Sequence, residues 1–135
     1  TAHAGARNDS AGNWCTVNLA TFESTTVPNV HVIGDSILAP LPKSGHMATN
    51  HAKVCAAAIV ELLAGRQPDP IPVIANTCYS ATSGSTSGYV AHVYRYEAGK
   101  GYVAQPEGGA TGKGDPLVFA YNESWAKNIW ANVLD

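Results

Sequence analysis

Several features are scarce or absent in this sequence, and each absence excludes a class of protein. Only 13% of the 135 residues are charged, and eight lysines and arginines against ten aspartates and glutamates give a net charge of −2. Without a basic patch or a polybasic run, nothing predicts binding to nucleic acid or to anionic lipid. No apolar stretch reaches membrane-spanning length, so no membrane span is predicted. The length fits one ordinary domain or two very small ones.

Motifs for metals, haem and dinucleotides are also missing. The three cysteines stand at positions 15, 55 and 78 without any C-x-x-C or C-x-x-C-H motif, so no haem is predicted on this chain. His46 and His51 are five residues apart, which does not hold both on one helix face, and no metal site is predicted. The histidines are better explained as scattered surface or satisfied side chains. No G-x-G-x-x-G fingerprint occurs in a strand-turn-helix context.

The first half of the chain contains a strand pattern followed by a helix pattern. A β-branched run predicts a strand over residues 30–34, with a short strand or turn over 16–26 leading to it. Beyond a Pro-rich turn, Ser44 fits the N-cap of an Ala-rich helix that extends to about Ala64. Gly65 then fits the C′ position, and the prolines that follow forbid continuation.

The second half predicts a small sheet and one closing helix. We expect strands that begin at residue 73 and cover 89–96, 102–103 and 117–121, separated by loops at 80–88 and 105–116. Asn122 is expected to cap a final helix in which Trp125, Ile129 and Val133 share one face. This half has too little apolar content for independent stability, and we expect contacts with another part of the protein to stabilise it.

The turn at Gly34-Asp35 is the first candidate for chemistry. It places a carboxylate just beyond a predicted buried strand, and ligands of α/β folds collect at the carboxyl ends of strands. The helix that starts shortly afterwards offers N–H groups to an electron-rich ligand atom. The alternative is a carboxylate that only caps the following turn.

Several short motifs accompany this turn in a fixed order. They are Asn8-Asp9-Ser10 with Trp14-Cys15, Thr21-Phe22-Glu23-Ser24, Pro40-Leu41-Pro42-Lys43-Ser44, Ala52-Lys53-Val54 and Asn76-Thr77-Cys78-Tyr79-Ser80. In this order and spacing they resemble the C-terminal part of the flavoprotein subunit of flavocytochrome c sulfide dehydrogenase. The resemblance covers about residues 8–96 and resumes over 121–129.

The resemblance implies an α+β fold in two parts. Residues 1–67 would complete an α/β FAD-binding domain with a strand, a turn and the Ala-rich helix. Residues 68–135 would form a small interface domain of one sheet and one helix. The resemblance also implies that FAD is bound mainly by an N-terminal half outside this sequence. The chain starts at Thr1 without an initiator Met or a signal-peptide pattern, so we expect a processed, proteolysed or deliberately cut product.

The same resemblance implies roles for five cofactor-binding residues. Gly34 and Asp35 would hold the ribityl chain of the flavin, and Lys43 and Ser44 would lie beside the pyrimidine edge, where cationic charge and N–H donors stabilise negative charge on reduction. Trp125 would approach the flavin on the side where electrons leave toward haem. The alternatives are a solvated surface lysine for Lys43 and a core anchor of the last helix for Trp125.

Cys78 is the candidate catalytic residue. In the resembling family the matching cysteine forms a redox-active disulfide with a second cysteine in the N-terminal half, and sulfide attacks that disulfide. The alternative is a buried, inert thiol. Cys15 and Cys55 are expected to be structural, the latter as a small core residue of the Ala-rich helix.

As a whole, the resemblance implies an enzyme that oxidises sulfide at a flavin–disulfide centre and passes electrons to a c-type cytochrome subunit in the periplasm. The isolated chain is expected to be inactive. Two other functions stay open: a sulfide:quinone reductase-like flavoprotein with another acceptor, and a non-catalytic module that docks a cytochrome or a scaffold. The closing helix is not strongly membrane-seeking, which disfavours the quinone alternative.

Overall fold

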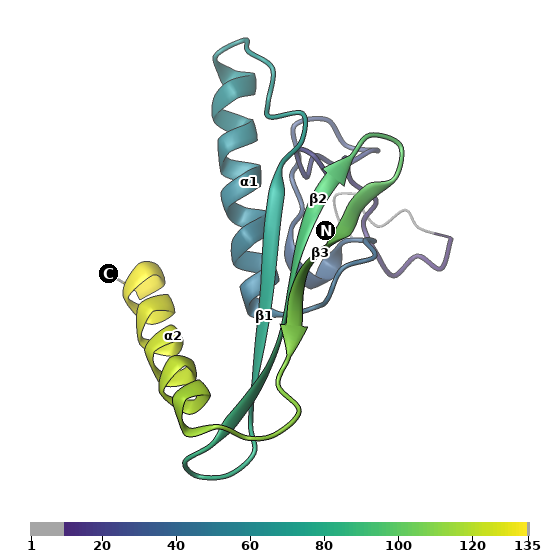
Figure 1. Cartoon of the computed structure of the whole chain (residues 1–135). Helices are drawn as coiled ribbons and strands as arrows, with labels where there is room; N and C mark the ends of the chain where they lie inside the picture. Colours follow the sequence, from purple (N-terminus) through teal and green to yellow (C-terminus); the bar gives the residue numbers. More distant parts are fainter. Residues whose placement is uncertain (1–9, 135) are drawn as a thin grey trace. The chain divides into compact units, whose positions relative to one another are not determined.

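The protein was analysed as a computed structural model that describes residues 10–134 (Figure 1). Its fold class is α+β, as predicted, with two long helices and one antiparallel sheet in the strand order β1-β2-β3. In chain order the elements are η2 (Gly34–Ser36), α1 (Gly45–Leu63), β1 (Val73–Ala81), β2 (Ser87–Glu97), β3 (Gly101–Ala110) and α2 (Pro116–Leu134). Asn8 and Asp9 of the first motif lie outside the described residues.

The chain divides into two compact units. The first comprises residues 1–76 and 93–106, and the second comprises 77–92 and 107–135. Each of the three strands therefore contributes residues to both units. The domain boundary predicted between residues 67 and 68 stays a prediction.

Helix α1 confirms the predicted Ala-rich helix and both of its ends. The Ser44 side chain accepts a hydrogen bond from the backbone N–H of Met47 at 3.1 Å, which satisfies one of the unpaired donors of the first turn. At the other end Gly65 adopts a φ of +68°, a left-handed conformation that favours glycine at C′. The buried face follows the helical repeat and consists of Met47, His51, Cys55 and Ala58.

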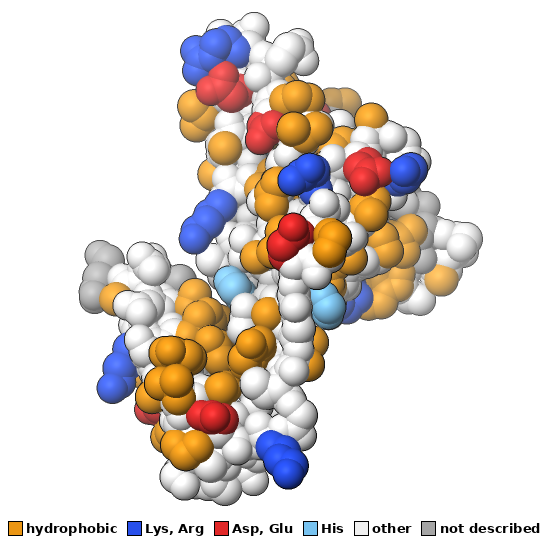
Figure 2. Space-filling view, viewed as in Figure 1, with side chains coloured by type: hydrophobic (Ala, Val, Ile, Leu, Met, Phe, Trp, Pro, Cys, Tyr) orange, Lys and Arg blue, Asp and Glu red, His pale blue; other side chains and the backbone are white. Residues whose placement is uncertain are grey.

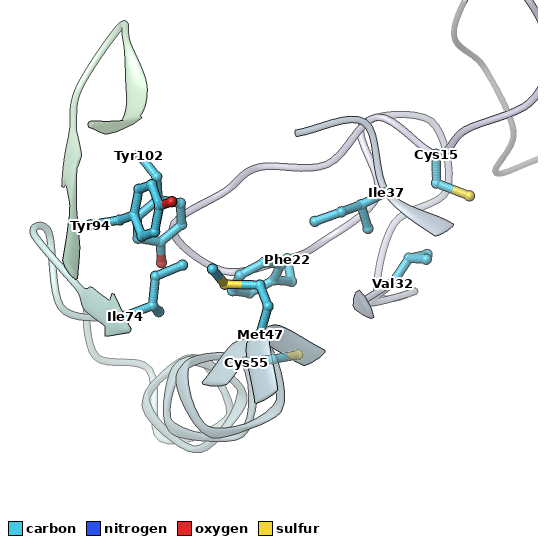
Figure 3. Close-up of a cluster of buried hydrophobic side chains, with 9 residues drawn as sticks. All are labelled: Cys15, Phe22, Val32, Ile37, Met47, Cys55, Ile74, Tyr94 and Tyr102. Carbon is cyan, nitrogen blue, oxygen red and sulfur yellow. The ribbon is translucent and has the colours of Figure 1, made fainter. Parts of the chain in front are cut away.

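The hydrophobic core of the first unit is built around this face (Figure 3). Its nine members come from α1, from the irregular segment before it and from the three strands: Cys15, Phe22, Val32, Ile37, Met47, Cys55, Ile74, Tyr94 and Tyr102. Phe22 is fully buried although its φ is +62°, which is unusual for a bulky residue. Its ring stacks on Tyr102, with 6.5 Å between centroids. Cys15 and Cys55 are core residues, as predicted.

The strand predicted over residues 30–34 does not form. His31 makes one isolated bridge with Glu23, and the chain then enters the short helix η2. The segment that would have to pair with this strand is folded into turns, as the hydrogen bonds from the amides of Thr21 and Phe22 to the Asn18 carbonyl show. The β-branched run therefore pairs with residues 22–24 at this single bridge, and no longer ladder forms.

In the sheet, β2 confirms the predicted strand 89–96, and β1 begins at Val73 as expected. The predicted loop over 80–88 is too long, because β1 continues to Ala81 and β2 already begins at Ser87. The loop predicted over 105–116 is wrong for its first half, since β3 pairs as far as Ala110. Here the glycines permit a close approach of strands: a Cβ at Gly108 would lie 2.6 Å from the carbonyl oxygen of Ala91.

The strand predicted over 117–121 is also wrong, because these residues form the first turns of α2. The Asp115 carboxylate accepts hydrogen bonds from the amides of Leu117 (2.6 Å) and Val118 (3.4 Å), so Asp115, and not Asn122, caps the helix. Pro116 follows at the first helical position, where its fixed φ and missing N–H fit. These start signals override the strand propensity of the residues that follow. The side chain of Val133 lies outside what the structure describes.

Candidate functional site

The predicted Gly34-Asp35 turn is the helix η2 in the first unit. Gly34 has a φ of +72°, and a Cβ there would touch the Ala48 Cβ of α1 at 3.4 Å. The Asp35 side chain is exposed, and within the described chain no hydrogen bond to its carboxylate is formed. The alternative in which Asp35 caps the following turn is therefore not supported, and the carboxylate is available as an acceptor.

Lys43 is an exposed residue whose ammonium nevertheless contacts three groups of the protein. Its ammonium donates hydrogen bonds to the carbonyl oxygens of Asp35 (2.5 Å) and Ile37 (3.3 Å). It also lies 3.9 Å from the centroid of the Trp14 ring, within the range of a cation–π interaction. Lys43 thus ties the C-terminal side of the turn to the segment before α1.

Ser44 uses its hydroxyl twice. Besides capping α1, it donates a hydrogen bond to Oδ1 of the buried Asn76 at 2.5 Å. Asn76 is the first residue of the Asn-Thr-Cys-Tyr-Ser motif, so this bond links the Lys-Ser motif to the start of the cysteine motif within the first unit. The predicted role of Ser44 beside a flavin stays a prediction.

His51 is a residue that the sequence-based reasoning missed. Its side chain is 2% exposed, and its Nδ1 atom accepts a hydrogen bond from the Gly34 amide at 3.2 Å. Burial lowers the pKa of His51 to about 4, although the Asp35 carboxylate acts in the opposite direction. The signal that could have found it is its place on the buried stripe, one turn after Met47 and one turn before Cys55.

In the second unit, Cys78 stands in β1 and is partly buried. The ring of Tyr79 contacts Trp125 of α2, with 6.1 Å between centroids, and Tyr89 of β2, with 6.4 Å. Trp125 therefore anchors α2 on the strands of this unit, which supports the packing role, while its role beside a flavin stays a prediction. Cys78 forms no disulfide with Cys15 or Cys55.

Two further kinds of site were tested on the described residues. No group of three or more His, Cys, Asp or Glu side chains could hold a metal ion there. No helix between residues 10 and 134 is long and apolar enough to cross a membrane. An open groove of about 650 Å³ lies along the second half of α1 and the segment 67–73, and it contains none of the predicted site residues.

A comparison with known protein families gives a match for the second half of the chain. Residues 70–134 match the family described as flavocytochrome c sulphide dehydrogenase, flavin-binding. Over this range the chain is similar to that flavin-binding family. The resemblance stated from the sequence motifs is thereby confirmed over this range.

The flavin-binding segment comprises all three strands and α2. Cys78 and Trp125 lie within it, whereas Gly34, Asp35, Lys43 and Ser44 precede it. The Ser44–Asn76 hydrogen bond reaches this segment within the first unit, because Ser44 precedes the segment and Asn76 belongs to it.

The turn before the segment also fits a flavin by its own chemistry. An exposed carboxylate that accepts no hydrogen bond from residues 10–134 suits the hydroxyl groups of a ribityl chain, which are hydrogen-bond donors. The first turn of α1 contains no acidic residue that would oppose an electron-rich atom at the helix N-terminus. The backbone at Gly34 and the carboxylate of Asp35 are therefore compatible with a flavin at this turn.

Proposed function

We propose that this protein is the part of a sulfide dehydrogenase flavoprotein that completes its FAD site, oxidises sulfide at a flavin–disulfide centre and passes the electrons to a c-type cytochrome. The family match over residues 70–134 is the observation that carries this proposal. FAD, when bound, accepts the two electrons that leave the sulfur centre.

In this proposal Cys78 supplies one sulfur of the redox-active disulfide. Hydrosulfide attacks one of the two sulfurs, a new S–S bond forms between the attacking sulfur and that cysteine, and the other cysteine leaves as a thiolate. The second cysteine would come from a polypeptide segment outside this sequence, because Cys15 and Cys55 are core residues of the first unit. Burial raises the pKa of the Cys55 thiol, which disfavours the reactive thiolate at that position.

The remaining residues have supporting roles in the proposal. Asp35 would accept hydrogen bonds from the ribityl hydroxyls at the Gly34 turn, and Lys43 would place positive charge near the pyrimidine edge. Trp125 would shield the ring system on the side that faces the cytochrome. The periplasm is the compartment proposed for this chemistry, since it permits the disulfide to persist.

The experiment is a substitution of the nucleophile in the whole flavoprotein. We expect Cys78→Ser to abolish sulfide oxidation while the protein keeps its flavin, because the disulfide cannot form. Cys55→Ala is the matched control, since it removes a thiol from α1 and should leave turnover close to that of the wild type. Sulfide turnover at the wild-type rate in Cys78→Ser would contradict the proposal.

The electron acceptor is tested separately. With a soluble c-type cytochrome as acceptor we expect sulfide-dependent reduction, and with a quinone analogue we expect none. The reverse pattern would favour the sulfide:quinone reductase-like alternative.

A further inference from the structure

The backbone around Asp35 is held by three segments, while its carboxylate is left exposed. From α1, His51 accepts the hydrogen bond of the Gly34 amide at 3.2 Å. From the segment before α1, Lys43 donates to the carbonyls of Asp35 and Ile37. From the N-terminal segment, the Cys15 amide donates to the Ser36 carbonyl at 2.9 Å, and the Leu38 amide donates to the Cys15 carbonyl at 2.8 Å.

A buried histidine at position 51 is energetically unfavourable if the side chain serves packing alone. It is almost completely buried against the ring of Phe22, with 4.7 Å between centroids. Because Nδ1 acts as an acceptor, the neutral ring carries its proton on Nε2. That atom is buried and has no hydrogen-bond partner in the described part of the chain. An apolar side chain of similar size would avoid this unsatisfied donor, so stability by itself does not explain a histidine here.

We propose that His51 is a positioning residue: its Nδ1 atom fixes the Gly34 amide, and through it presents the Asp35 carboxylate to the flavin. This inference rests on the flavin role proposed above for Asp35. Lys43 and Cys15 hold the opposite side of the turn, so the acceptor is set in place before the ligand arrives.

Burial, and not the neighbouring charges, keeps the His51 ring in the accepting form. Lys43 and Asp35 are the charged groups that influence it, and they act in opposite directions. Burial dominates and lowers the pKa of His51 to about 4, so the ring is neutral near pH 7. On α1, one turn before His51, the Ala48 Cβ would lie 3.4 Å from a Cβ placed at Gly34, so a side chain at this position would lie against the helix.

The hydrogen bond itself is tested without flavin. In uniformly ¹⁵N-labelled flavoprotein stripped of FAD, an N–H···N bond transmits a scalar coupling between the two nitrogens. We expect such a coupling between the Gly34 amide nitrogen and His51 Nδ1, together with an Nε2-protonated tautomer. If the coupling is absent from the wild-type spectrum, the inference is overturned, whether or not any variant folds.

The positioning role is tested by FAD titration of three variants of the whole flavoprotein. His51→Leu removes the acceptor, and we expect FAD affinity to fall about tenfold, the value of one hydrogen bond. His51→Asn places an oxygen near the position of Nδ1 and should restore most of that loss. Thr49→Ala is the control on the same helix, because the Thr49 hydroxyl bonds only within α1, to the Gly45 carbonyl.

The outcomes separate this inference from the proposed function. Unchanged FAD affinity in His51→Leu, or an equal loss in His51→Asn, overturns the positioning role while the flavin site stands. Asp35→Asn provides the other comparison: if it leaves FAD affinity unchanged, the flavin role of the turn fails, and the inference built on that role fails with it.

Discussion

The two compact units of this chain differ in what holds them together. The first has a continuous core of nine buried side chains around Phe22 and Met47. Among the described residues of the second unit, Val118 is the one buried hydrophobic side chain. The polar side chain of Ser87 is fully buried in the same unit. Leu117, Tyr121 and Trp130 of α2 are each more than half exposed, and Figure 2 shows hydrophobic side chains gathered over this helix.

This difference in buried side chains indicates that the first unit is the one that can hold a rigid polar site. A packed core can keep the Gly34 turn in one arrangement, since side chains in a dense interior resist displacement. The second unit relies on aromatic contacts of Tyr79 and on close backbone approaches of glycine. We therefore expect its amides to open at lower free energy than those of the first unit.

The largest expected effect is the removal of the central core ring. Phe22→Ala should lower the free energy of unfolding by about 3–5 kcal/mol, because it leaves a cavity in a dense core. Val118→Ala should cost only about 2 kcal/mol, the value of the methyl groups lost. Chemical denaturation of both variants measures the contrast. Equal losses would show that the second unit has a core of comparable strength.

The next effect is a pH dependence that belongs to the first unit alone. The unfolded chain protonates His51 near pH 6.5, whereas the folded chain does so only at about pH 4. The stabilisation from neutral His51 is therefore complete above pH 6.5 and is lost as the pH falls toward 4, by on the order of 3 kcal/mol over the full window.

Hydrogen exchange that compares peptides from α1 and α2 across this range would localise the pH effect. After correction for the intrinsic pH dependence of exchange, we expect the amides of α1 to exchange faster as the pH is lowered. The variant His51→Gln should lose most of this pH dependence. A slope that persists in His51→Gln would assign the effect to other groups.

A smaller effect tests the backbone packing of the second unit. Gly108→Ala should destabilise the protein by about 1–3 kcal/mol, since its Cβ would lie 2.6 Å from the Ala91 carbonyl oxygen and the strands must shift. Gly109→Ala is the matched control on the next residue, where no atom lies within 4 Å of the new Cβ. Thermal unfolding of the pair gives the difference, and similar midpoints would mean that β3 is free to move away.

The smallest effects compare the two helix caps. Asp115→Ala should cost about 1 kcal/mol through the loss of bonds to Leu117 and Val118. Ser44→Ala should cost somewhat more, because it also removes the hydrogen bond to the buried Asn76. Urea midpoints of the two variants decide the order. A larger loss in Asp115→Ala would reverse the expected ranking of the two units.

Elements with a long, consistent sequence pattern could be predicted better than elements with a short or glycine-rich one. Helix α1 was predicted to within a residue, because its cap, its stripe and its terminal glycine agree with one another. The composition of Leu117 to Tyr121 favours a strand, but the Asp115-Pro116 start signal places these residues in the first turns of α2. The extent of β3 was missed because a glycine-rich segment resembles a loop unless its neighbour is known.

By itself the sequence indicated the family that residues 70–134 match and the fold class, because motifs and local periodicity are visible without tertiary information. It indicated Asp35, Lys43, Ser44 and Cys78 as candidates for chemistry. Only the tertiary structure decided which segments hold the Gly34 turn. Lys43 and His51 come from different segments to hold one turn, and contacts between residues distant along the chain leave no periodic mark in the sequence.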